Sequence, residues 1–294
     1  MNIKNIIIVT GGAGFIGSNL IKYLLKKTNL KIISLDNYST GSKKNHIIHK
    51  NVKYIKGENI DILKILKLYK KKIKVIFHFG EFSRIYQSFL NSNLCLNSNI
   101  YNSFEVINFA KDNKIKIIYS ATSSNLGNNG KDENSSPYSW TKSKNIELIK
   151  NYSKWFGLKY EILFFYNVYG PGQINTGKMA TIIGIFETQY SSKKLLTIVK
   201  PGSQKRDFTH IDDIIEGCYL AMKKGKNDEY MLSSNKTYSI LQIARMFKVK
   251  HKFLPSRPGD RDDSTILNNN AKKILGFKAK KNIKSYIKEF INKS

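Results

Sequence analysis

Thr10-Gly11-Gly12-Ala13-Gly14-Phe15-Ile16-Gly17 joins two segments that differ in their pattern of apolar residues. Residues 3–10 form an apolar run, which predicts a strand of a parallel sheet with both faces covered by helices. In residues 15–26 the apolar side chains recur at helical spacing. Glycines at a strand-to-helix junction allow a tight turn and a close approach to a pyrophosphate, which then faces the helix N-terminus. The stretch therefore predicts a dinucleotide-binding turn.

Asp36 ends the second predicted strand and supports the dinucleotide hypothesis. A carboxylate about 20 residues after the glycines can accept hydrogen bonds from the adenosine ribose and repel a 2′-phosphate, which favours NAD over NADP. The alternative is that Asp36 only initiates a turn before Asn37. Residues 37–41 are too polar for a strand and fit a loop beside the adenosine. Glu58 and Asn59 are both candidates for contacting the adenine.

Strand and helix patterns alternate along the chain. We expect further strands at residues 31–35, 52–55, 75–79, 116–120 and 160–165, and helices at residues 15–26, 62–68, 93–111 and 139–156. This alternation predicts an α/β fold with a Rossmann-type doubly wound parallel sheet and a smaller C-terminal α/β substrate lobe. The predicted NAD-binding domain covers residues 1–166, with residues 207–232 returning to it, and residues 167–294 form mainly the substrate-binding lobe.

The bulk composition narrows the class of protein. A chain of 294 residues with 41% hydrophobic content can bury a large core. No stretch approaches the roughly 20 apolar residues of a membrane span and no signal-peptide pattern is present, so we expect a cytoplasmic protein without a membrane partner. The net charge is +29, but the lysines are spread evenly without a recognition motif, so nucleic acid is not an expected partner. Cys95 and Cys218 lack a CxxC or His partner, which favours buried thiols over a disulfide or a metal site.

Tyr138 and Lys142 form a Tyr-x-x-x-Lys pair at the start of a predicted helix. Spacing of i,i+4 puts both side chains on one helix face. A phenol with a pKa of about 10 is a poor base at neutral pH, but a nearby ammonium favours the phenolate. The pair is therefore a candidate catalytic base. The alternative is an exposed tyrosine and lysine on a lysine-rich surface.

Taken together, the motifs resemble the extended short-chain dehydrogenase/reductase family, especially its NAD-dependent nucleotide-sugar epimerases and dehydratases such as UDP-glucose 4-epimerase. The resemblance spans nearly the whole chain. Its motifs are Thr10 to Gly17, Asp36-Asn37, His78-Phe79-Gly80, Asn99, Ser120 to Gly127, Tyr138 with Lys142, Asn167-Val168-Tyr169-Gly170-Pro171-Gly172-Gln173, Arg206-Asp207-Phe208-Thr209-His210-Ile211-Asp212-Asp213 and Arg257-Pro258-Gly259-Asp260.

The resemblance implies roles for individual residues. Tyr138 would be the catalytic base, Lys142 would bind the nicotinamide ribose and tune Tyr138, and Thr122 would hydrogen-bond the sugar. With the glycine pattern, it assigns cofactor binding to Gly11, Gly14, Phe15, Ile16, Gly17, Asp36, Asn37, Ser39, Thr40, Gly41, Glu58, Asn59, Phe79, Gly80, Asn99, Tyr138 and Lys142. Substrate binding falls to Ser83, Thr122, Ser123, Asn167, Arg206, Arg257 and Asp260. The two arginines would hold the nucleotide diphosphate, since a guanidinium fork suits phosphate oxygens; the alternative is a surface salt bridge.

The chain also departs from the family pattern. Ser123-Ser124 follow Thr122 where 4,6-dehydratases have the Asp-Glu pair that eliminates water, which disfavours dehydration. Phe164 stands where the family often has Arg, and the loop between Gly127 and Tyr138 is short. The segment Glu81-Phe82-Ser83-Arg84 replaces the small apolar residues common there. These departures bear on sugar specificity and not on cofactor binding.

The resemblance implies a nucleotide-sugar 4-epimerase that acts on UDP-glucose and UDP-galactose or on an N-acetylated pair. Tyr138 would remove the proton of the sugar 4-hydroxyl as hydride passes to NAD, and the 4-keto sugar would turn over before hydride returns to its other face. The alternatives are a nucleotide-sugar 4-ketoreductase, which consumes NADH, and a non-catalytic NAD-binding module. The predicted helices around residues 93–111 and 139–156 resemble those that pair in the family's dimers, so we expect a homodimer.

Overall fold

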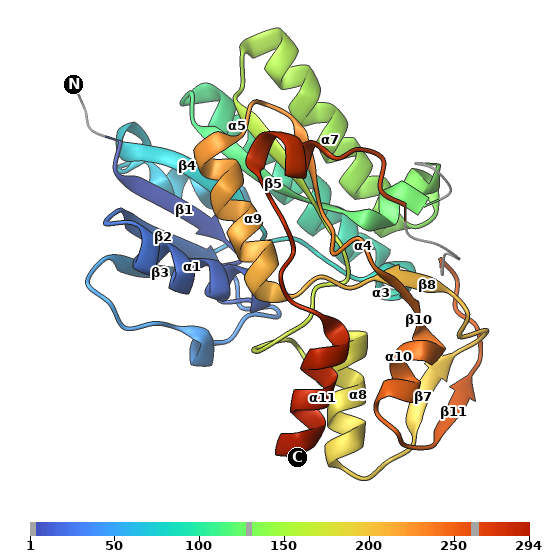
Figure 1. The fold of residues 1–294 in the computed structure, drawn as a ribbon. Helices are drawn as coiled ribbons and strands as arrows, with labels where there is room; N and C mark the ends of the chain where they lie inside the picture. Colours follow the sequence, from blue (N-terminus) through green and yellow to red (C-terminus); the bar gives the residue numbers. More distant parts are fainter. Residues whose placement is uncertain (1–3, 128–130, 260–264) are drawn as a thin grey trace.

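A seven-stranded parallel sheet forms the centre of the structure, a computed structural model that describes residues 4–127, 131–259 and 265–294 (Figure 1). The strand order is β3-β2-β1-β4-β5-β6-β9, which is the doubly wound arrangement predicted from the sequence. The strands are β1 (Ile6–Thr10), β2 (Lys31–Asp36), β3 (Val52–Lys56), β4 (Ile73–His78), β5 (Lys116–Thr122), β6 (Tyr160–Phe165) and β9 (Glu229–Leu232). The strands expected after residue 30 are confirmed to within two residues at each end.

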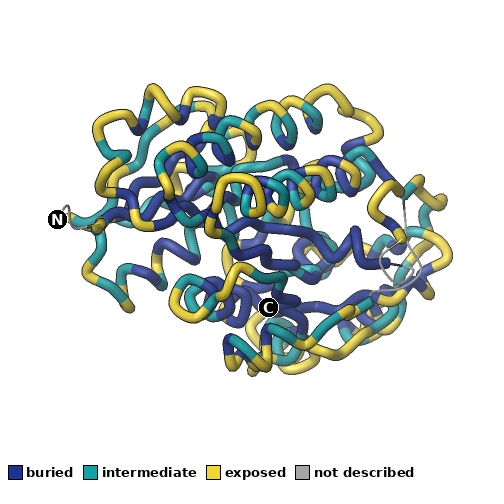
Figure 2. The backbone as a smooth tube through the Cα atoms, turned by 90° about the horizontal axis from the view of Figure 1, so that it is seen from above, coloured by how far each residue is buried: buried dark blue, intermediate teal, exposed yellow. Residues whose placement is uncertain are grey.

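Helices cover both faces of this sheet. On one face lie α1 (Phe15–Lys27), α9 (Ile211–Lys224) and the short helix η7 (Ala271–Leu275). On the other face lie α2 (Ile62–Leu66), α5 (Asn102–Asp112) and α7 (Pro137–Phe156). Side chains alternate between the two faces along a strand. In β1, Ile6 and Ile8 pack on the face covered by α2, α5 and α7, and Ile7 and Val9 pack on the face covered by α1 and α9. Burial on both faces explains why the strands are apolar throughout, and Figure 2 shows these buried strands along the middle of the molecule.

The segment between β4 and β5 differs from the single helix predicted over residues 93–111. It begins with α3 (Ile85–Leu90), which was not predicted, and continues through α4 (Ser92–Leu96), a π-helical turn at Asn97–Tyr101 and α5. The π turn coincides with Asn99, whose buried side chain makes hydrogen bonds outside its own helix. Such side-chain contacts depend on residues distant in sequence, which periodicity does not report.

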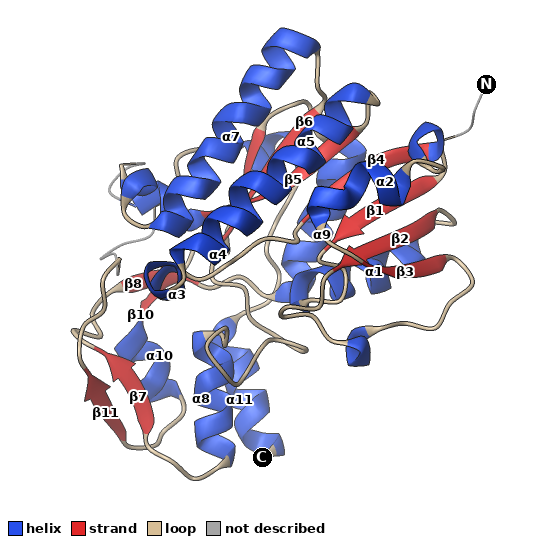
Figure 3. Cartoon of the chain, turned by 180° about the vertical axis from the view of Figure 1, so that it is seen from behind, coloured by secondary structure: helices blue, strands red, loops and turns tan. Residues whose placement is uncertain are grey.

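A smaller α/β lobe lies below the carboxyl ends of the strands (Figures 1 and 3). It contains α8 (Ile182–Ser191), β7 (Leu196–Val199), β8 (Lys205–Asp207), β10 (Thr237–Ser239), α10 (Ile240–Met246), β11 (His251–Leu254) and α11 (Ile283–Lys293). β7 pairs with β11 in parallel, and β8 pairs with β10 in antiparallel fashion. The lobe has an apolar core of its own, built around Phe186, Phe208 and Phe247.

Between the strands of the lobe, the chain returns to the sheet. α9 packs against α1, and β9 pairs with β6 at the edge of the sheet. The later segment with Ala271 and Leu275 also packs in the sheet's core, so a second part of residues 167–294, besides residues 207–232, lies with the sheet. The functional division at residue 166 stays a prediction.

Cys95 and Cys218 are both fully buried free thiols, as expected from their sequence contexts. In the described ranges, no helix has both the length and the apolar character needed to span a membrane. The same ranges contain no cluster of three or more His, Cys, Asp or Glu side chains placed to bind a metal ion.

Candidate active site

A cleft of about 1070 Å³ opens where the carboxyl ends of the central strands face the smaller lobe. In open α/β sheets this edge is where ligands bind. The structure brings most of the predicted site residues to this one cleft. Those that line it are Gly11, Gly14, Phe15, Ile16, Gly17, Asp36, Asn37, Ser39, Thr40, Glu58, Asn59, Phe79, Gly80, Ser83, Thr122, Ser123, Tyr138, Lys142, Asn167 and Arg206.

The glycine turn between β1 and α1 is too tight for side chains at Gly11, Gly12 and Gly17. A Cβ on Gly12 would lie 2.3 Å from the hydroxyl oxygen of Ser34. Gly11 has a φ of +69°, and a Cβ on it would lie 2.8 Å from the nitrogen of Gly80. A Cβ on Gly17 would lie 2.2 Å from the carbonyl oxygen of Gly11. Gly14 is different, because its Cβ would come only within 3.2 Å of that oxygen. No other heavy atom of the described chain lies within 4 Å of that Cβ position, apart from the atoms of Gly14 itself and its two neighbours in sequence. The space beside Gly14 and the N-terminus of α1 therefore fits a dinucleotide pyrophosphate.

Asp36 connects the end of β2 to this glycine turn. Its Oδ2 accepts a hydrogen bond from the nitrogen of Ala13 and its Oδ1 one from the nitrogen of Tyr38, both at 2.8 Å. The second contact is the turn that was the alternative reading of Asp36, yet the carboxylate also lines the cleft. The two interpretations are therefore compatible. A carboxylate in this position suits the ribose hydroxyls of a dinucleotide.

Glu58 and Asn59, the two candidates for the adenine contact, have different surroundings. The Glu58 carboxylate is exposed and accepts hydrogen bonds from the amide of Asn37 at 3.1 and 3.2 Å. The Asn59 amide is buried and donates to the carbonyl of Gly80 at 2.8 Å. Asn59 thus supports the strand end opposite the glycine turn, while Glu58 lies at the open rim.

Tyr138 and Lys142 lie on the first two turns of α7. The helix begins with Pro137 after the N-cap Ser136, whose hydroxyl accepts a hydrogen bond from the nitrogen of Ser139. Both side chains of the pair line the cleft and both are largely buried. The exposed surface pair that was the alternative is thereby excluded for this helix.

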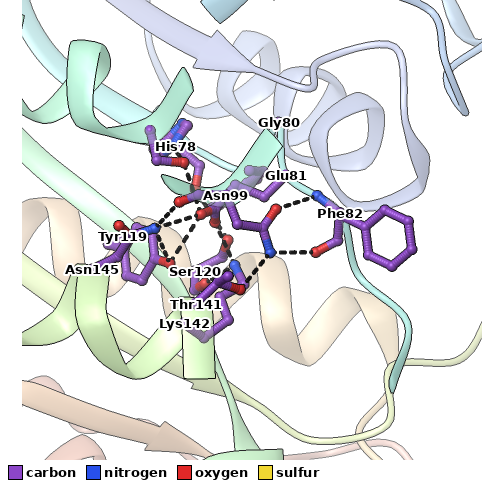
Figure 4. A network of polar contacts seen from close by, with 12 residues as sticks. His78, Gly80, Glu81, Phe82, Asn99, Tyr119, Ser120, Thr141, Lys142 and Asn145 are labelled. Atoms are coloured by element: carbon purple, nitrogen blue, oxygen red, sulfur yellow. Dashed lines mark hydrogen bonds and ion pairs between the residues drawn. The ribbon is translucent and has the colours of Figure 1, made fainter. Parts of the chain in front are cut away.

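The ammonium of Lys142 has two strong partners (Figure 4). It forms an ion pair with the carboxylate of Glu81, and it donates a hydrogen bond to the carbonyl of Ser120 at 2.6 Å. The exposed fractions of the Lys142 and Glu81 side chains are 3% and 1%, so this ion pair is screened very little by solvent.

Thr122 ends β5 at the floor of the cleft. Its hydroxyl accepts a hydrogen bond from the nitrogen of Ser124 and contacts the Ser124 hydroxyl, both at 3.1 Å. The side-chain amide of Asn167 donates a hydrogen bond to the carbonyl oxygen of Asp207 at 2.8 Å, which places Asn167 beside Arg206. The cleft therefore combines hydroxyls, an amide and cations on the lobe side. Such a set can bind a polar, anionic ligand.

Three predicted residues are not part of the cleft lining formed by the described chain. Gly41 packs against the Asp36 carboxylate from behind. Asn99 is fully buried and holds the main chain of Phe82 through hydrogen bonds of 2.7 and 3.0 Å. Arg257 is exposed and lies over the ring of Tyr86 at 4.9 Å. Asp260, a fourth predicted residue, is outside the described residues.

Three charged residues that line the cleft were not among the predicted site residues, namely Glu81, Arg84 and Lys178. Glu81 pairs with Lys142, and Arg84 donates from Nε and Nη2 to the carbonyl of Met179 at 3.0 and 2.6 Å. Burial lowers the pKa of Arg84, while the nearby Tyr138 phenol opposes that shift. For Glu81 and Arg84, the feature of the sequence that could have indicated a site role is their charge in a segment that directly follows a buried strand.

The chain is similar to known proteins over nearly its whole length. A model described as the NAD dependent epimerase/dehydratase family matches residues 7–239. An uncharacterized protein of Methanocaldococcus jannaschii is 30% identical over 319 aligned positions, which cover 99% of this chain and 96% of the relative.

Solved structures match the sheet and the lobe together. UDP-glucose 4-epimerase from Thermotoga maritima, with UDP-glucose, superimposes with a TM-score of 0.90 at 25% identity, covering 98% of this chain and 97% of that one. UDP-glucuronic acid 4-epimerase from Bacillus cereus, in complex with UDP-glucuronic acid and NAD, gives a TM-score of 0.87 at 26% identity over 98% and 99% of the two chains.

Proposed function

This chain belongs to the NAD-dependent epimerase/dehydratase family, and from that premise we propose that it is a nucleotide-sugar 4-epimerase. The proposed substrates are UDP-glucose and UDP-galactose or their N-acetylated equivalents. The observation that carries this proposal is the convergence of Tyr138, Lys142 and Thr122 in one cleft with the glycine turn. The solved neighbour from Thermotoga maritima, which is named as a UDP-glucose 4-epimerase, supports the choice of reaction.

NAD would lie along the cleft from Asp36 to Lys142. The glycine turn and the N-terminus of α1 would hold its pyrophosphate, and Asp36 its adenosine ribose. When bound, NAD supplies the acceptor and later the donor of a hydride. Two of the three N–H groups of Lys142 donate within the described chain, to Glu81 and to Ser120, which leaves one for a ribose hydroxyl.

Tyr138 is the proposed base. Its phenolate would take the proton of the sugar 4-hydroxyl, and after the oxidised sugar has turned, the phenol would return a proton to the 4-oxygen. The ammonium of Lys142 favours the phenolate by its charge. The Thr122 hydroxyl, which donates to the Ser124 hydroxyl in this structure, would turn to donate a hydrogen bond to the same sugar oxygen, and it needs no proton transfer of its own.

Elimination of water from the sugar is a weaker alternative, although dehydratases belong to the same family. Dehydration at C6 needs an acid and a base beyond Tyr138. At the positions after Thr122, where 4,6-dehydratases have Asp and Glu, this chain has the buried hydroxyls of Ser123 and Ser124. A serine hydroxyl is a poor acid or base at neutral pH, so these residues favour simple epimerisation.

The test is an incubation with a catalytic amount of NAD and a panel of UDP-, dTDP- and GDP-sugars, followed by chromatography. We expect interconversion of a 4-epimeric pair without net consumption of NAD. Tyr138→Phe should abolish interconversion yet still bind NAD. Oxidation of NADH in proportion to product would identify a 4-ketoreductase instead, and the absence of any sugar conversion would contradict the proposal.

A further inference from the structure

The Glu81–Lys142 ion pair is a buried charge pair inside the cleft, formed by residues from two different elements. Lys142 belongs to α7, and Glu81 lies in the turn after β4. Burying two charges costs several kcal/mol unless each has good partners. A pair in this place therefore requires a surrounding set of hydrogen bonds, and the structure contains one.

Three donors converge on the second oxygen of the Glu81 carboxylate (Figure 4). The hydroxyl of Ser103 donates to Oε1 at 2.9 Å, the hydroxyl of Tyr119 at 3.0 Å and the amide of Asn145 at 3.0 Å. These donors come from α5, β5 and α7. Together with Lys142 on Oε2, they give Glu81 four donors, a pattern that suits an ionised carboxylate because it only accepts.

A chain of hydrogen bonds continues from Ser103 to the start of the glycine turn. The hydroxyl of Thr10 accepts from the nitrogens of Phe79 and Gly80 at 3.1 Å, so its hydrogen points to Nδ1 of His78 at 2.7 Å. His78 then carries its proton on Nε2 and donates to Ser103 at 2.9 Å. Every donor in this chain points toward Glu81. The carboxylate is thereby held at a fixed distance from both β1 and α7.

We propose that Glu81 is a positioning residue that fixes the ammonium of Lys142 and, through its negative charge, sets the pH range in which Tyr138 and Lys142 work together. The proposal rests on the proposed epimerase function for its kinetic readout. In this role Glu81 acts on the sugar and the cofactor only through Lys142.

The direction of the effect follows from the sign of the charge. A carboxylate disfavours loss of a proton from every group near it, so its removal makes deprotonation easier for all of them. The titratable groups around Glu81 are Lys142 on α7, Tyr119 on β5, His78 on β4 and Cys95 on α4. Tyr138 lies one turn before Lys142 on α7, and another charged group that acts on it is Arg84. In Glu81→Gln, the phenolate of Tyr138 and the neutral amine of Lys142 should both form at lower pH.

The kinetic test compares kcat and KM from pH 5 to 10 in three variants with the wild-type enzyme. In Glu81→Gln we expect both limbs of the kcat profile to move to lower pH by about 1 unit, because a neighbouring charge changes a pKa by this order. In Glu81→Asp the negative charge stays, but the shorter side chain moves the carboxylate away from Lys142. We therefore expect kcat to fall at least tenfold while the pH dependence of kcat stays that of the wild-type enzyme. The KM for the sugar should change less than twofold in either variant.

The matched control is Glu161→Gln. Glu161 is also a fully buried glutamate paired with a lysine, since it lies 2.6 Å from Lys116, but it sits at the opposite end of the sheet from the cleft. We expect this variant to lose stability and to keep the wild-type pH profile. If Glu81 had only a structural role, Glu81→Gln and Glu161→Gln would both lose stability and both keep the wild-type pH profile.

A spectroscopic titration keeps the inference testable if the chain converts no sugar. The phenolate absorbance of Tyr138 is obtained as the difference between each protein and its Tyr138→Phe counterpart. In the Glu81→Gln background this difference should appear at lower pH than in the wild-type background. Identical titrations in both, an unshifted kcat profile in Glu81→Gln, or a shifted one in Glu81→Asp would each overturn the proposal, whereas lack of sugar conversion alone contradicts only the proposed function.

Discussion

The main-chain nitrogen of Ala13 donates a hydrogen bond to Oδ2 of Asp36 at 2.8 Å. This contact joins the two parts of the dinucleotide pattern, which are 23 positions apart in the sequence. Asp36 lines the cleft but is only 7% exposed, so its negative charge is partly desolvated. The orientation of the carboxylate is therefore set before any ligand binds.

The first prediction concerns Asp36→Asn. The amide keeps one acceptor oxygen for the turn but loses the charge, so the dissociation constant for NAD should rise about tenfold, as expected for a weakened charge-assisted hydrogen bond. The dissociation constant for NADP should fall relative to that for NAD, because the 2′-phosphate is no longer repelled. Calorimetric titration measures both constants. The exposed Asp61→Asn is the control, and an unchanged NAD-to-NADP ratio in Asp36→Asn would argue against the assignment.

The second prediction separates two glycines of the same turn. In Gly17→Ala the new methyl would lie 2.2 Å from a carbonyl oxygen, so the backbone must move and the free energy of unfolding should fall by about 3 kcal/mol or more. In Gly14→Ala the new methyl would lie 3.2 Å from the carbonyl oxygen of Gly11 at a position that lines the cleft, and we expect a loss of about 1 kcal/mol with at least tenfold weaker NAD binding. Denaturant unfolding and NAD titration give the two quantities. Equal destabilisation by both substitutions would contradict this division.

Local patterns were sufficient for the parts of the site that lie close together in sequence. The glycine turn joins one strand directly to the next helix, where the hydrophobic pattern changes period. Tyr138 and Lys142 fall within two turns of one helix, where their shared face follows directly from the helical period. The end of β2 at Asp36 follows from the apolar strand before it. These residues reach the cleft because the carboxyl ends of parallel strands meet at one edge.

Contacts between distant segments were not predictable in the same way. Glu81 meets Lys142 across 61 positions, and its charge alone does not show which cation it will pair with. Asn99 lies in a π turn and binds main chain instead of lining the cleft, a detail that periodicity does not contain. Arg257 rests on Tyr86, because the segment around it packs against α3. The order of motifs predicts the fold, but side-chain partners are set by packing.

The third prediction concerns assembly, which we propose to be a homodimer. The neighbouring helices α4, α5 and α7 run along one side of the molecule (Figure 3) and carry exposed apolar side chains at Leu94, Phe104 and Trp140, with exposed fractions of 56%, 40% and 38%. Large exposed apolar side chains on neighbouring helices are a feature of protein–protein interfaces. The wild-type protein should sediment as a dimer at micromolar concentration, and Phe104→Glu combined with Trp140→Glu as a monomer.

The control for assembly is Leu68→Glu. Leu68 is 88% exposed and lies just after α2, outside the three helices that carry the proposed interface, so its substitution should leave the dimer intact. A wild-type protein that sediments only as a monomer would exclude the proposed interface. Dissociation by Leu68→Glu as well would show that added charge, and not position, is responsible.

The fourth prediction is a pH dependence of stability that arises at His78. Burial lowers the pKa of this histidine to about 4, with Glu81 opposing the shift and Lys142 adding to it. In the unfolded chain the value is about 6.5, so folding favours the neutral ring. The stability contributed by the neutral ring is complete above pH 6.5 and is lost as the pH falls through 4. From pH 7 to pH 4 this loss should reach about 3 kcal/mol.

Replacement of the ring tests this assignment. In His78→Gln the side chain cannot take up a proton, so the free energy of unfolding should decline less between pH 7 and pH 4 than in the wild-type protein, by about 3 kcal/mol. The exposed His49→Gln should keep the wild-type decline. Urea unfolding at several pH values gives the three slopes, and the other titrating groups are common to all three proteins and cancel in the comparison. If His78→Gln lost stability at pH 7 but kept the wild-type slope, the ring would have a structural role only, and protonation of His78 would not be the source of the acid sensitivity.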